Sequence, residues 1–209
     1  MLRCRNKQKG FTLIEAAIVL VIVGFLLAAV LQGRQMIESA RFKSLKADLG
    51  EYREAFDTFQ QRYNALPGDY ADADARLGMA ASSTGNGNGV IDSGGTLGCD
   101  AVDEEECLAW RHLRAARLIR GDDGLTGTDA PPGHAFQGTV SGFFTGSQGN
   151  GEFGHKLLVL DVPARFANQL DDDLDDGDPD AGVISCNSGC SGGVWPADDE
   201  ALVDVIYAF

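Results

Sequence analysis

The architecture of this chain follows from Gly10-Phe11-Thr12-Leu13-Ile14-Glu15 and from the uncharged run that extends from Ala16 to Leu31. The run consists mostly of Val, Leu, Ile and Ala. Together with the preceding Phe-Thr-Leu-Ile it is long enough, as a helix, to cross the roughly 30 Å hydrocarbon core of a membrane. Basic residues stand before it at positions 3, 5, 7 and 9. Because a basic flank stays in the cytoplasm, the sequence predicts a membrane anchor whose remaining chain is exported.

One carboxylate, Glu15, interrupts this apolar segment. An ionised group within a membrane helix is costly and usually marks a partner or a function. An α-amino group, with an ordinary pKa near ~8, is charged at neutral pH and could compensate the carboxylate when both leave water. The alternative is that Glu15 lies at the lipid headgroups, near the positive end of the helix dipole.

The junction from Lys9 to Glu15 resembles the processing site of the type IV pilin and type II secretion pseudopilin superfamily. An ordinary secretory signal would carry a small-residue cleavage site beyond the apolar run, and none is found there. The resemblance implies that a prepilin peptidase cuts after Gly10, that Phe11 becomes the N-methylated terminus, and that the helix stays on the mature protein. It also implies that Glu15 pairs with the terminal amine of a neighbouring subunit during assembly.

Length and composition limit the rest of the chain. With 209 residues and an apolar fraction of 44%, the chain can form one membrane helix and one modest globular domain. We expect a leader at 1–10, a transmembrane or filament-core helix at 11–33, an amphipathic helix at 34–64 and a head at 65–209. The formal charge is −14, and about −18 once the basic leader is removed. Such a surface repels nucleic acid, so no nucleic-acid partner is expected.

The second half of the long helix has a one-sided apolar stripe. Its members recur three or four positions apart: Leu45, Leu49, Tyr52, Phe56, Phe59 and Tyr63. This spacing predicts a helix that packs on a separate layer, and a coiled coil is the alternative. The helix should stop near Asn64, because Pro67 and Gly68 follow.

Shorter elements are expected after the helix. Asp103 as N-cap, with Glu106 reaching back, predicts a helix that runs to about Arg120 and is closed by Gly121. A further short helix should begin at Pro163, with Phe166, Ala167, Leu170 and Leu174 facing inward. Apolar runs between glycines predict strands at 139–145, 156–162, 182–186 and 202–209. The predicted fold is therefore α+β, with a long amino-terminal helix packed on an antiparallel sheet.

Four cysteines lie in the exported part: Cys99, Cys107, Cys186 and Cys190. Four cysteines allow three connectivities, which sequence cannot distinguish. Neighbour pairing is favoured because each pair closes a short loop. A zinc site is the alternative, although the compartment is oxidising and the spacing is unusual.

Two segments are candidates for calcium. Acidic residues crowd on a turn at Asp175, Asp176, Asp178 and Asp180, where an extracellular Ca²⁺ could bind, or where solvent alone could screen an exposed acidic face. The segment from Thr84 to Asp92 is similar to an EF-hand loop, but it lacks the leading Asp and the closing Glu, so a glycine-rich turn is the alternative.

The sequence predicts a structural subunit and no enzyme, since no nucleophile, base and orienting group stand at recognisable spacing. The resemblance implies assembly into a type IV pilus through the amino-terminal helix. The alternatives are a pseudopilin of a type II secretion system and a membrane-anchored binding module that does not polymerise. The implied partners are other pilins, the prepilin peptidase and an assembly platform. The implied location is the bacterial inner membrane, with the head in the periplasm, and then a pilus or pseudopilus.

Overall fold

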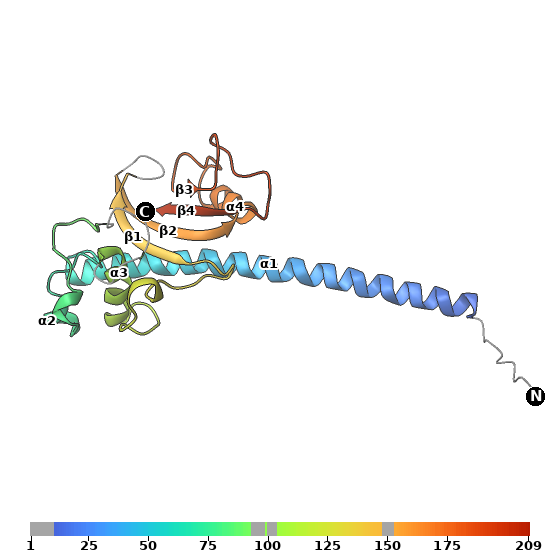
Figure 1. Ribbon diagram of the computed structural model, residues 1–209, viewed down its shortest axis with the longest axis horizontal. Coiled ribbons are helices and arrows are strands. Elements are labelled where there is room, and N and C mark those ends of the chain that lie inside the picture. Colours follow the sequence, from blue (N-terminus) through green and yellow to red (C-terminus); the bar gives the residue numbers. More distant parts are fainter. Residues whose placement is uncertain (1–10, 93–98, 100–103, 148–152) are drawn as a thin grey trace, which may run out of the picture. The chain divides into compact units, whose positions relative to one another are not determined.

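The computed structural model describes residues 11–92, 99, 104–147 and 153–209 (Figure 1). The chain divides into two compact units, Met1–Arg41 and Phe42–Phe209. Helix α1, Leu13–Tyr63, contributes residues to both units. The leader positions, including Gly10, lie outside the described residues.

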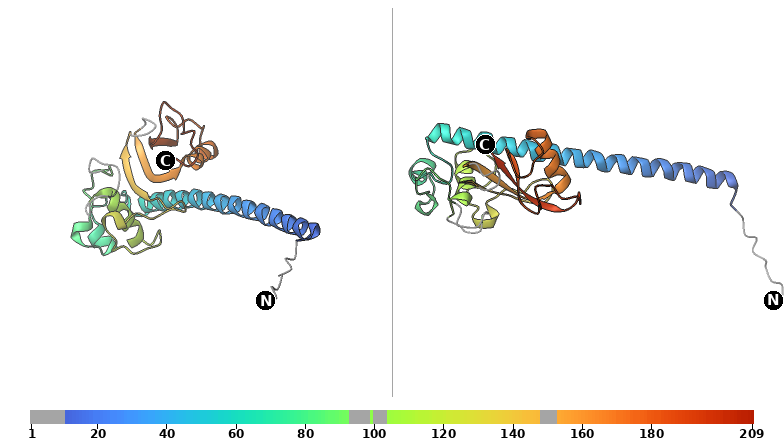
Figure 2. Two further views of the ribbon diagram at one scale, coloured as in Figure 1. Left: turned by 45° about the vertical axis from the view of Figure 1, so that its right-hand side comes forward. Right: turned by 90° about the horizontal axis from the view of Figure 1, so that it is seen from above.

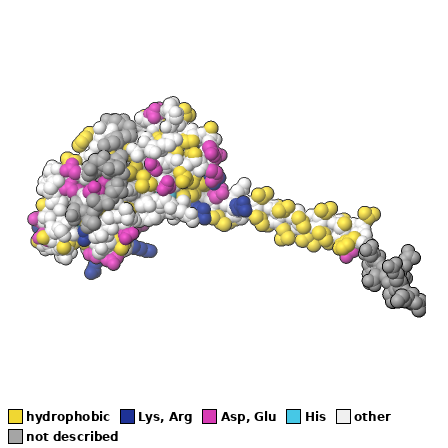
Figure 3. All heavy atoms as spheres, viewed as in Figure 1, with side chains coloured by type: hydrophobic (Ala, Val, Ile, Leu, Met, Phe, Trp, Pro, Cys, Tyr) yellow, Lys and Arg dark blue, Asp and Glu magenta, His cyan; other side chains and the backbone are white. Residues whose placement is uncertain are grey.

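The described part of the first unit is a helix with an apolar surface. Its side chains from Phe11 to Leu31 are all exposed, and Figure 3 shows hydrophobic groups along this part of α1. By length and composition, α1 qualifies as a helix that could cross a membrane. The residues that would span it make no buried contacts within the chain, so their apolar surface requires lipid or other helices as its environment.

The second unit is built on a four-stranded antiparallel sheet. Its strands are β1 Val140–Gly146, β2 Gly154–Pro163, β3 Ile184–Ser188 and β4 Leu202–Ala208. Their spatial order is β1-β2-β4-β3, so the last strand of the chain is an interior strand of the sheet. The predicted antiparallel sheet is therefore confirmed, and the strand boundaries differ from the predicted ones by at most two residues.

Shorter helices complete the second unit. They are α2 Ala73–Leu77, α3 Glu105–Ala115 and α4 Ala164–Leu174, with short 3-10 turns at Ala81–Ser83 and Gly127–Asp129. Figures 1 and 2 show the carboxyl-terminal part of α1 running along one face of the sheet. The α+β architecture predicted from the sequence is the one observed.

The apolar stripe of α1 forms the centre of the core. Leu45, Leu49, Phe56 and Phe59 are buried, whereas Tyr52 and Tyr63 are half-buried at its margins. The register of the sheet places Phe143, Leu157, Tyr207 and Ile184 in one row that faces the same core. A smaller cluster of Phe144, Leu158 and Ile206 is buried separately. Adjacent strand residues alternate between these clusters, as the two-residue period of a strand requires.

Helix α3 is shorter than the sequence predicts. Its N-cap is Glu104, while the expected N-cap, Asp103, lies outside the described residues. The helix ends at Ala115, not near Arg120, because Arg117 adopts a left-handed φ of 58°. Its N–H donates to Arg114 O at 2.8 Å, and Leu118 N–H donates to Leu113 O at 2.9 Å. These two bonds form a Schellman termination, so Arg117 takes the position that we expected Gly121 to take.

Helix α4 was predicted with one error. It begins at Ala164 after Pro163, and Phe166, Ala167 and Leu170 are buried as expected. Leu174 is 37% exposed instead of facing the core. It is the last residue of the helix, and the chain leaves the helical path directly after it.

His112 is a structural residue of the core. It is fully buried; Gly68 N–H donates to its Nδ1 at 2.9 Å, and its Nε2 lies 2.8 Å from Ser83 O. Because Nδ1 must accept, Nε2 carries the proton and donates to Ser83. Burial lowers the pKa of His112 to about 4, against the opposing effect of the Ser83 bond. The neutral ring thus ties α3 to the two loops that follow α1.

We predict that His112 makes the head less stable in acid. The pKa of this histidine is ~6.5 in the unfolded chain and about 4 in the folded head. Between these pH values the unfolded state binds a proton that the folded state does not bind. The neutral His112 ring contributes roughly 3 kcal/mol to the free energy of unfolding. This contribution is fully present above the pKa of the unfolded state and is lost as the pH falls to the pKa of the folded state. The stability of the head can be followed by tryptophan fluorescence of the full chain in detergent, which gives a thermal midpoint at each pH.

The matched variant is His112→Gln, which removes this titration and leaves all the others. The variant should have a lower thermal midpoint than the wild type at neutral pH. The difference between the two midpoints should shrink as the pH falls towards the pKa of folded His112. A difference that stays constant over this pH range would contradict the conclusion that His112 is neutral in the folded head.

Candidate functional site

The amino-terminal end of α1 carries the residues that the sequence marks for processing and assembly. Phe11 is 80% exposed and precedes the helix, whereas Gly10 lies outside the described residues. Thr12 O accepts the first helical hydrogen bond, from Ala16 N at 3.2 Å. Thr12 is therefore the N-cap, and Phe11 stands one residue before it.

Thr12 and Glu15 form a local pair on this first turn. The Glu15 N–H donates to Thr12 Oγ1 at 3.3 Å, and the Thr12 hydroxyl donates to Glu15 Oε2 at 3.4 Å. Our sequence analysis did not identify this pair, although Thr-x-x-Glu is the pattern of a capping box. The cap holds the carboxylate at the positive end of the helix dipole, close in sequence to where cleavage after Gly10 would create a new amine.

The head carries two cysteine pairs at disulfide distance. Cys99 pairs with Cys107, with their Cα atoms 5.1 Å apart, and Cys186 pairs with Cys190 at 6.3 Å. These are the neighbour pairs that the sequence favours. The first pair lies beside strand β1, where Cys99 N–H donates to Ser141 Oγ at 3.2 Å and Trp110 Nε1 donates to Ser141 O at 2.8 Å.

The acidic segment after α4 is partly buried and internally bonded. Asp171, Asp175 and Asp176 bring one carboxylate oxygen each within 4.8 Å of one another, whereas Asp178 and Asp180 are outside this group. Asp171, which the sequence does not distinguish from the other acidic residues of this segment, is fully buried. Its Oδ2 accepts from Trp195 Nε1 at 2.9 Å, and burial raises its pKa against the effect of that bond.

Backbone groups also bind this acidic cluster. The Asp175 carboxylate accepts the N–H groups of Val183 and Ile184, and Asp171 Oδ1 accepts Gly177 N–H at 3.3 Å. These bonds fold the acidic turn back on the start of β3. Hydrogen bonding therefore offsets part of the like-charge repulsion that the sequence predicts at this helix end.

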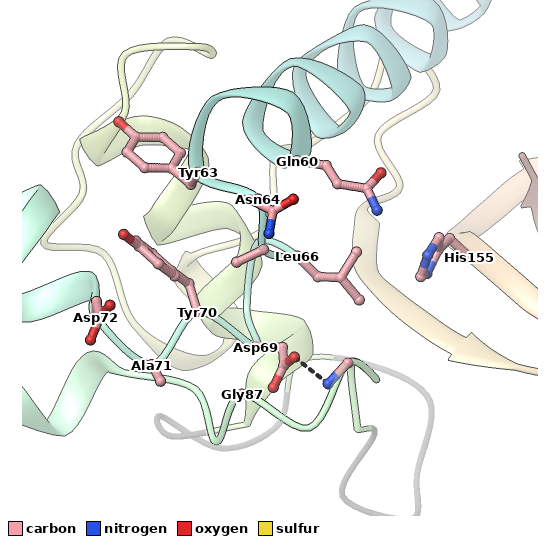
Figure 4. Close-up of a pocket in the computed structure, with 12 residues that line it drawn as sticks. Gln60, Tyr63, Asn64, Leu66, Asp69, Tyr70, Ala71, Asp72, Gly87 and His155 are labelled. Carbon is pink, nitrogen blue, oxygen red and sulfur yellow. Dashed lines mark hydrogen bonds between the residues drawn. The ribbon is translucent and has the colours of Figure 1, made fainter.

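A pocket of about 470 Å³ lies where α1 ends (Figure 4). Tyr63 and Tyr70 line it, with ring centroids 5.4 Å apart, and Asp69 and His155 lie at other parts of its wall. The Asp69 side chain is drawn in Figure 4 with its hydrogen bond to the neighbouring glycine loop. In that loop, Asn86 and Asn88 use their side-chain oxygens to accept backbone N–H groups. Gly95, which stands where an EF-hand loop has its closing Glu, lies outside the described residues.

The histidines of the head make structural contacts. His112 is bonded at both ring nitrogens as described above. His134 Nε2 lies 2.7 Å from Leu160 O, and its Nδ1 accepts from Phe136 N at 3.2 Å. His155 Nδ1 lies 3.0 Å from Thr145 Oγ1. Backbone partners thus occupy both nitrogens of two of the three histidines.

Comparison with protein families identifies a match in the amino-terminal part of the chain. Residues 5–31 match the family described as the prokaryotic N-terminal methylation motif. Searches of curated proteins and of solved structures found no significant match. The matched residues include Gly10, Phe11 and Glu15 and continue through the exposed apolar part of α1. This chain carries the N-terminal methylation motif that is the hallmark of type IV pilin and pseudopilin prepilin-like proteins.

Proposed function

We propose that this chain is a structural subunit that is processed after Gly10 and assembled through α1 into a type IV pilus. The observation that carries the proposal is the position of the methylation motif, which covers the start of a helix whose apolar side chains are exposed throughout residues 11–31. Apolar surface of this extent requires a cover in water. The inner membrane supplies it before assembly, and the helices of neighbouring subunits supply it in a filament.

The amino-terminal turn supports the assembly role of Glu15. Thr12 caps the helix and bonds to Glu15, so the carboxylate is held close to the terminus that processing would create. In an apolar filament core an unpaired carboxylate is costly, and the N-methylated amine of a neighbouring Phe11 provides the opposite charge. The partners in this proposal are copies of this chain or other pilins, the prepilin peptidase and the assembly platform.

Two other functions fit the same motif. A pseudopilin of a type II secretion system would use the same processing and the same helix. A membrane-anchored binding module would keep the anchor but would not polymerise. We favour the pilus because the head, at 65–209, is larger than a minimal pseudopilin needs.

The first prediction concerns processing. Mass spectrometry of the chain from membranes should find a methylated Phe11 terminus. Gly10→Leu should block cleavage, since the peptidase acts beside this small residue. Gly24→Ala is the matched control and should be processed normally, because a Cβ at position 24 meets no atom within 4 Å. An intact Met1 terminus in assembled material would contradict the proposal.

The second prediction concerns Glu15. Glu15→Leu should insert in the membrane and be processed, since it makes the helix more apolar, but sheared surface fibres should contain far less of the chain. Thr12→Ala is the comparison: it removes the cap and the hydroxyl bond to Glu15, at about 1 kcal/mol, but it keeps the negative charge that would pair with the amine. It should retain most of the fibre yield.

The fibre assay also separates the three functions. Surface fibres that contain the chain, and that depend on Glu15, support the pilus. A Glu15-dependent loss of protein secretion without such fibres indicates the pseudopilin. Normal function of Glu15→Leu in both assays indicates the non-polymerising module.

The third prediction concerns calcium at the acidic turn. If Asp175, Asp176, Asp178 and Asp180 bind the ion, millimolar Ca²⁺ should raise the melting midpoint of the head, Mg²⁺ should not, and Asp176→Ala with Asp178→Ala should abolish the rise. Asp172→Ala, an exposed acid on the same helix end, is the control. Equal midpoints with Ca²⁺, Mg²⁺ and chelator would leave an acidic turn stabilised by its own hydrogen bonds and by solvent.

A further inference from the structure

The exposed loop before Ile91 contains two consecutive Asn–Gly pairs, Asn86-Gly87 and Asn88-Gly89. Glycine has no side chain to hinder attack by its nitrogen on the amide carbon of the preceding asparagine. Gly87 and Gly89 both line the pocket in Figure 4, so water has access to both pairs. By sequence and exposure the two pairs are equivalent.

Three contacts surround the atoms that would react at Asn88. Gly89 N–H donates to Asp69 Oδ2 at 2.7 Å. Val90 N–H donates to the amide oxygen of Asn88 at 2.8 Å. Asn88 Nδ2 donates to Asp92 Oδ2 at 3.0 Å. The nitrogen nucleophile thus meets a carboxylate, the carbonyl oxygen meets a hydrogen-bond donor, and the leaving nitrogen meets a second carboxylate.

Asn86 has a similar arrangement, but a different group lies at its glycine nitrogen. Its amide oxygen accepts from Asn88 N at 2.9 Å, and its Nδ2 lies 3.4 Å from Asp92 Oδ2. Gly87 N–H, however, donates to the main-chain oxygen of Asp69 at 3.0 Å and not to its carboxylate. A neutral carbonyl is a far weaker base than a carboxylate.

The carboxylate of Asp69 is fixed in place. Asp69 is only 3% exposed, and its Oδ1 accepts Asn88 N–H at 2.9 Å while its Oδ2 accepts Gly89 N–H. The backbone of Gly85 packs directly against this residue, since a Cβ on Gly85 would collide with Gly68 and Asp69. The base is therefore held against the Gly89 nitrogen, as an oriented catalytic group must be.

We propose that Asn88 is a site of self-catalysed deamidation in which Asp69 acts as the base. Asp69 takes the proton of Gly89 N–H as that nitrogen forms a bond to Asn88 Cγ. The Val90 N–H stabilises the negative charge that develops on the amide oxygen. The Cγ–Nδ2 bond then breaks, the proton passes to Nδ2, and ammonia leaves a five-membered succinimide. This proton transfer regenerates the Asp69 carboxylate. Water then opens the ring at either carbonyl, which yields aspartate or isoaspartate.

The product changes the loop. At position 88 an amide that donates to Asp92 becomes a carboxylate beside a carboxylate, so one hydrogen bond is lost and like charges are placed together. The modified loop should open towards solvent. This inference uses residues of the head alone and does not depend on the proposed function.

The experiment follows both asparagines in one sample. The full chain in detergent is incubated at neutral pH, and peptide mass spectrometry quantifies aspartate and isoaspartate at positions 86 and 88 over time. We expect Asn88 to convert about tenfold faster than Asn86, which is less than the roughly hundredfold typical of general base catalysis in enzymes. In Asp69→Asn the rate at Asn88 should fall to that of Asn86. Asp72→Asn, which removes another acid of the same pocket, should change neither rate.

A second measurement separates catalysis from a loosened loop. In strong denaturant the two pairs should convert at similar rates, and these rates give the reference for each site. A native rate at Asn88 above its unfolded rate supports the proposal. Equal native rates at the two sites, a native rate below the unfolded one, or faster conversion of Asn88 in Asp69→Asn would each overturn it, because Asp69 would then hold the loop closed and protect it.

Discussion

The head depends on the packing of one apolar stripe of α1 against the sheet. Phe56 is at its centre: its ring centroid lies 5.2 Å from that of Phe143 and 5.1 Å from that of Phe209. Phe42 stacks on Phe166 of α4 at 5.8 Å, so the same stripe also holds the last helix. Each such buried side chain contributes about 1.5–3 kcal/mol through the hydrophobic effect. A four-stranded sheet exposes too much apolar surface on this face to be stable without that cover.

Much of this arrangement could be predicted because the controlling signals are periodic. The spacing from Leu45 to Tyr63 specifies a one-sided helix, and the alternating runs after position 138 specify strands. The ends of elements were harder to predict. The end of α3 depends on Arg117 adopting a left-handed φ of 58°, a conformation for which glycine is the usual signal, so Gly121 was a reasonable but wrong choice. Leu174 was misplaced because periodicity continues past the point where a helix stops packing.

The candidate sites also differ in how far the sequence could predict them. The pattern from Gly10 to Glu15 is contiguous, so sequence alone identifies it. Thr12 was visible as half of a capping box, yet its importance depends on a hydrogen bond that only the structure shows. Asp171 and Asp69 could not be singled out, since a buried carboxylate is distinguished from a solvated one by distant partners. For Asp171 that partner is Trp195, and for Asp69 it is the loop at Asn88 and Gly89.

The strand order has a consequence for how the chain is made. β4 pairs with both β2 and β3, whereas β3 has no other neighbour among the described strands of the sheet. Neither the sheet nor the core can close until β4 has joined both strands, because strand pairing at large sequence separation cannot precede the arrival of its partner. The head is therefore incomplete until β4 inserts between β2 and β3. Truncation within β4 would detach β3 and open the core, so the truncated head should be sensitive to protease.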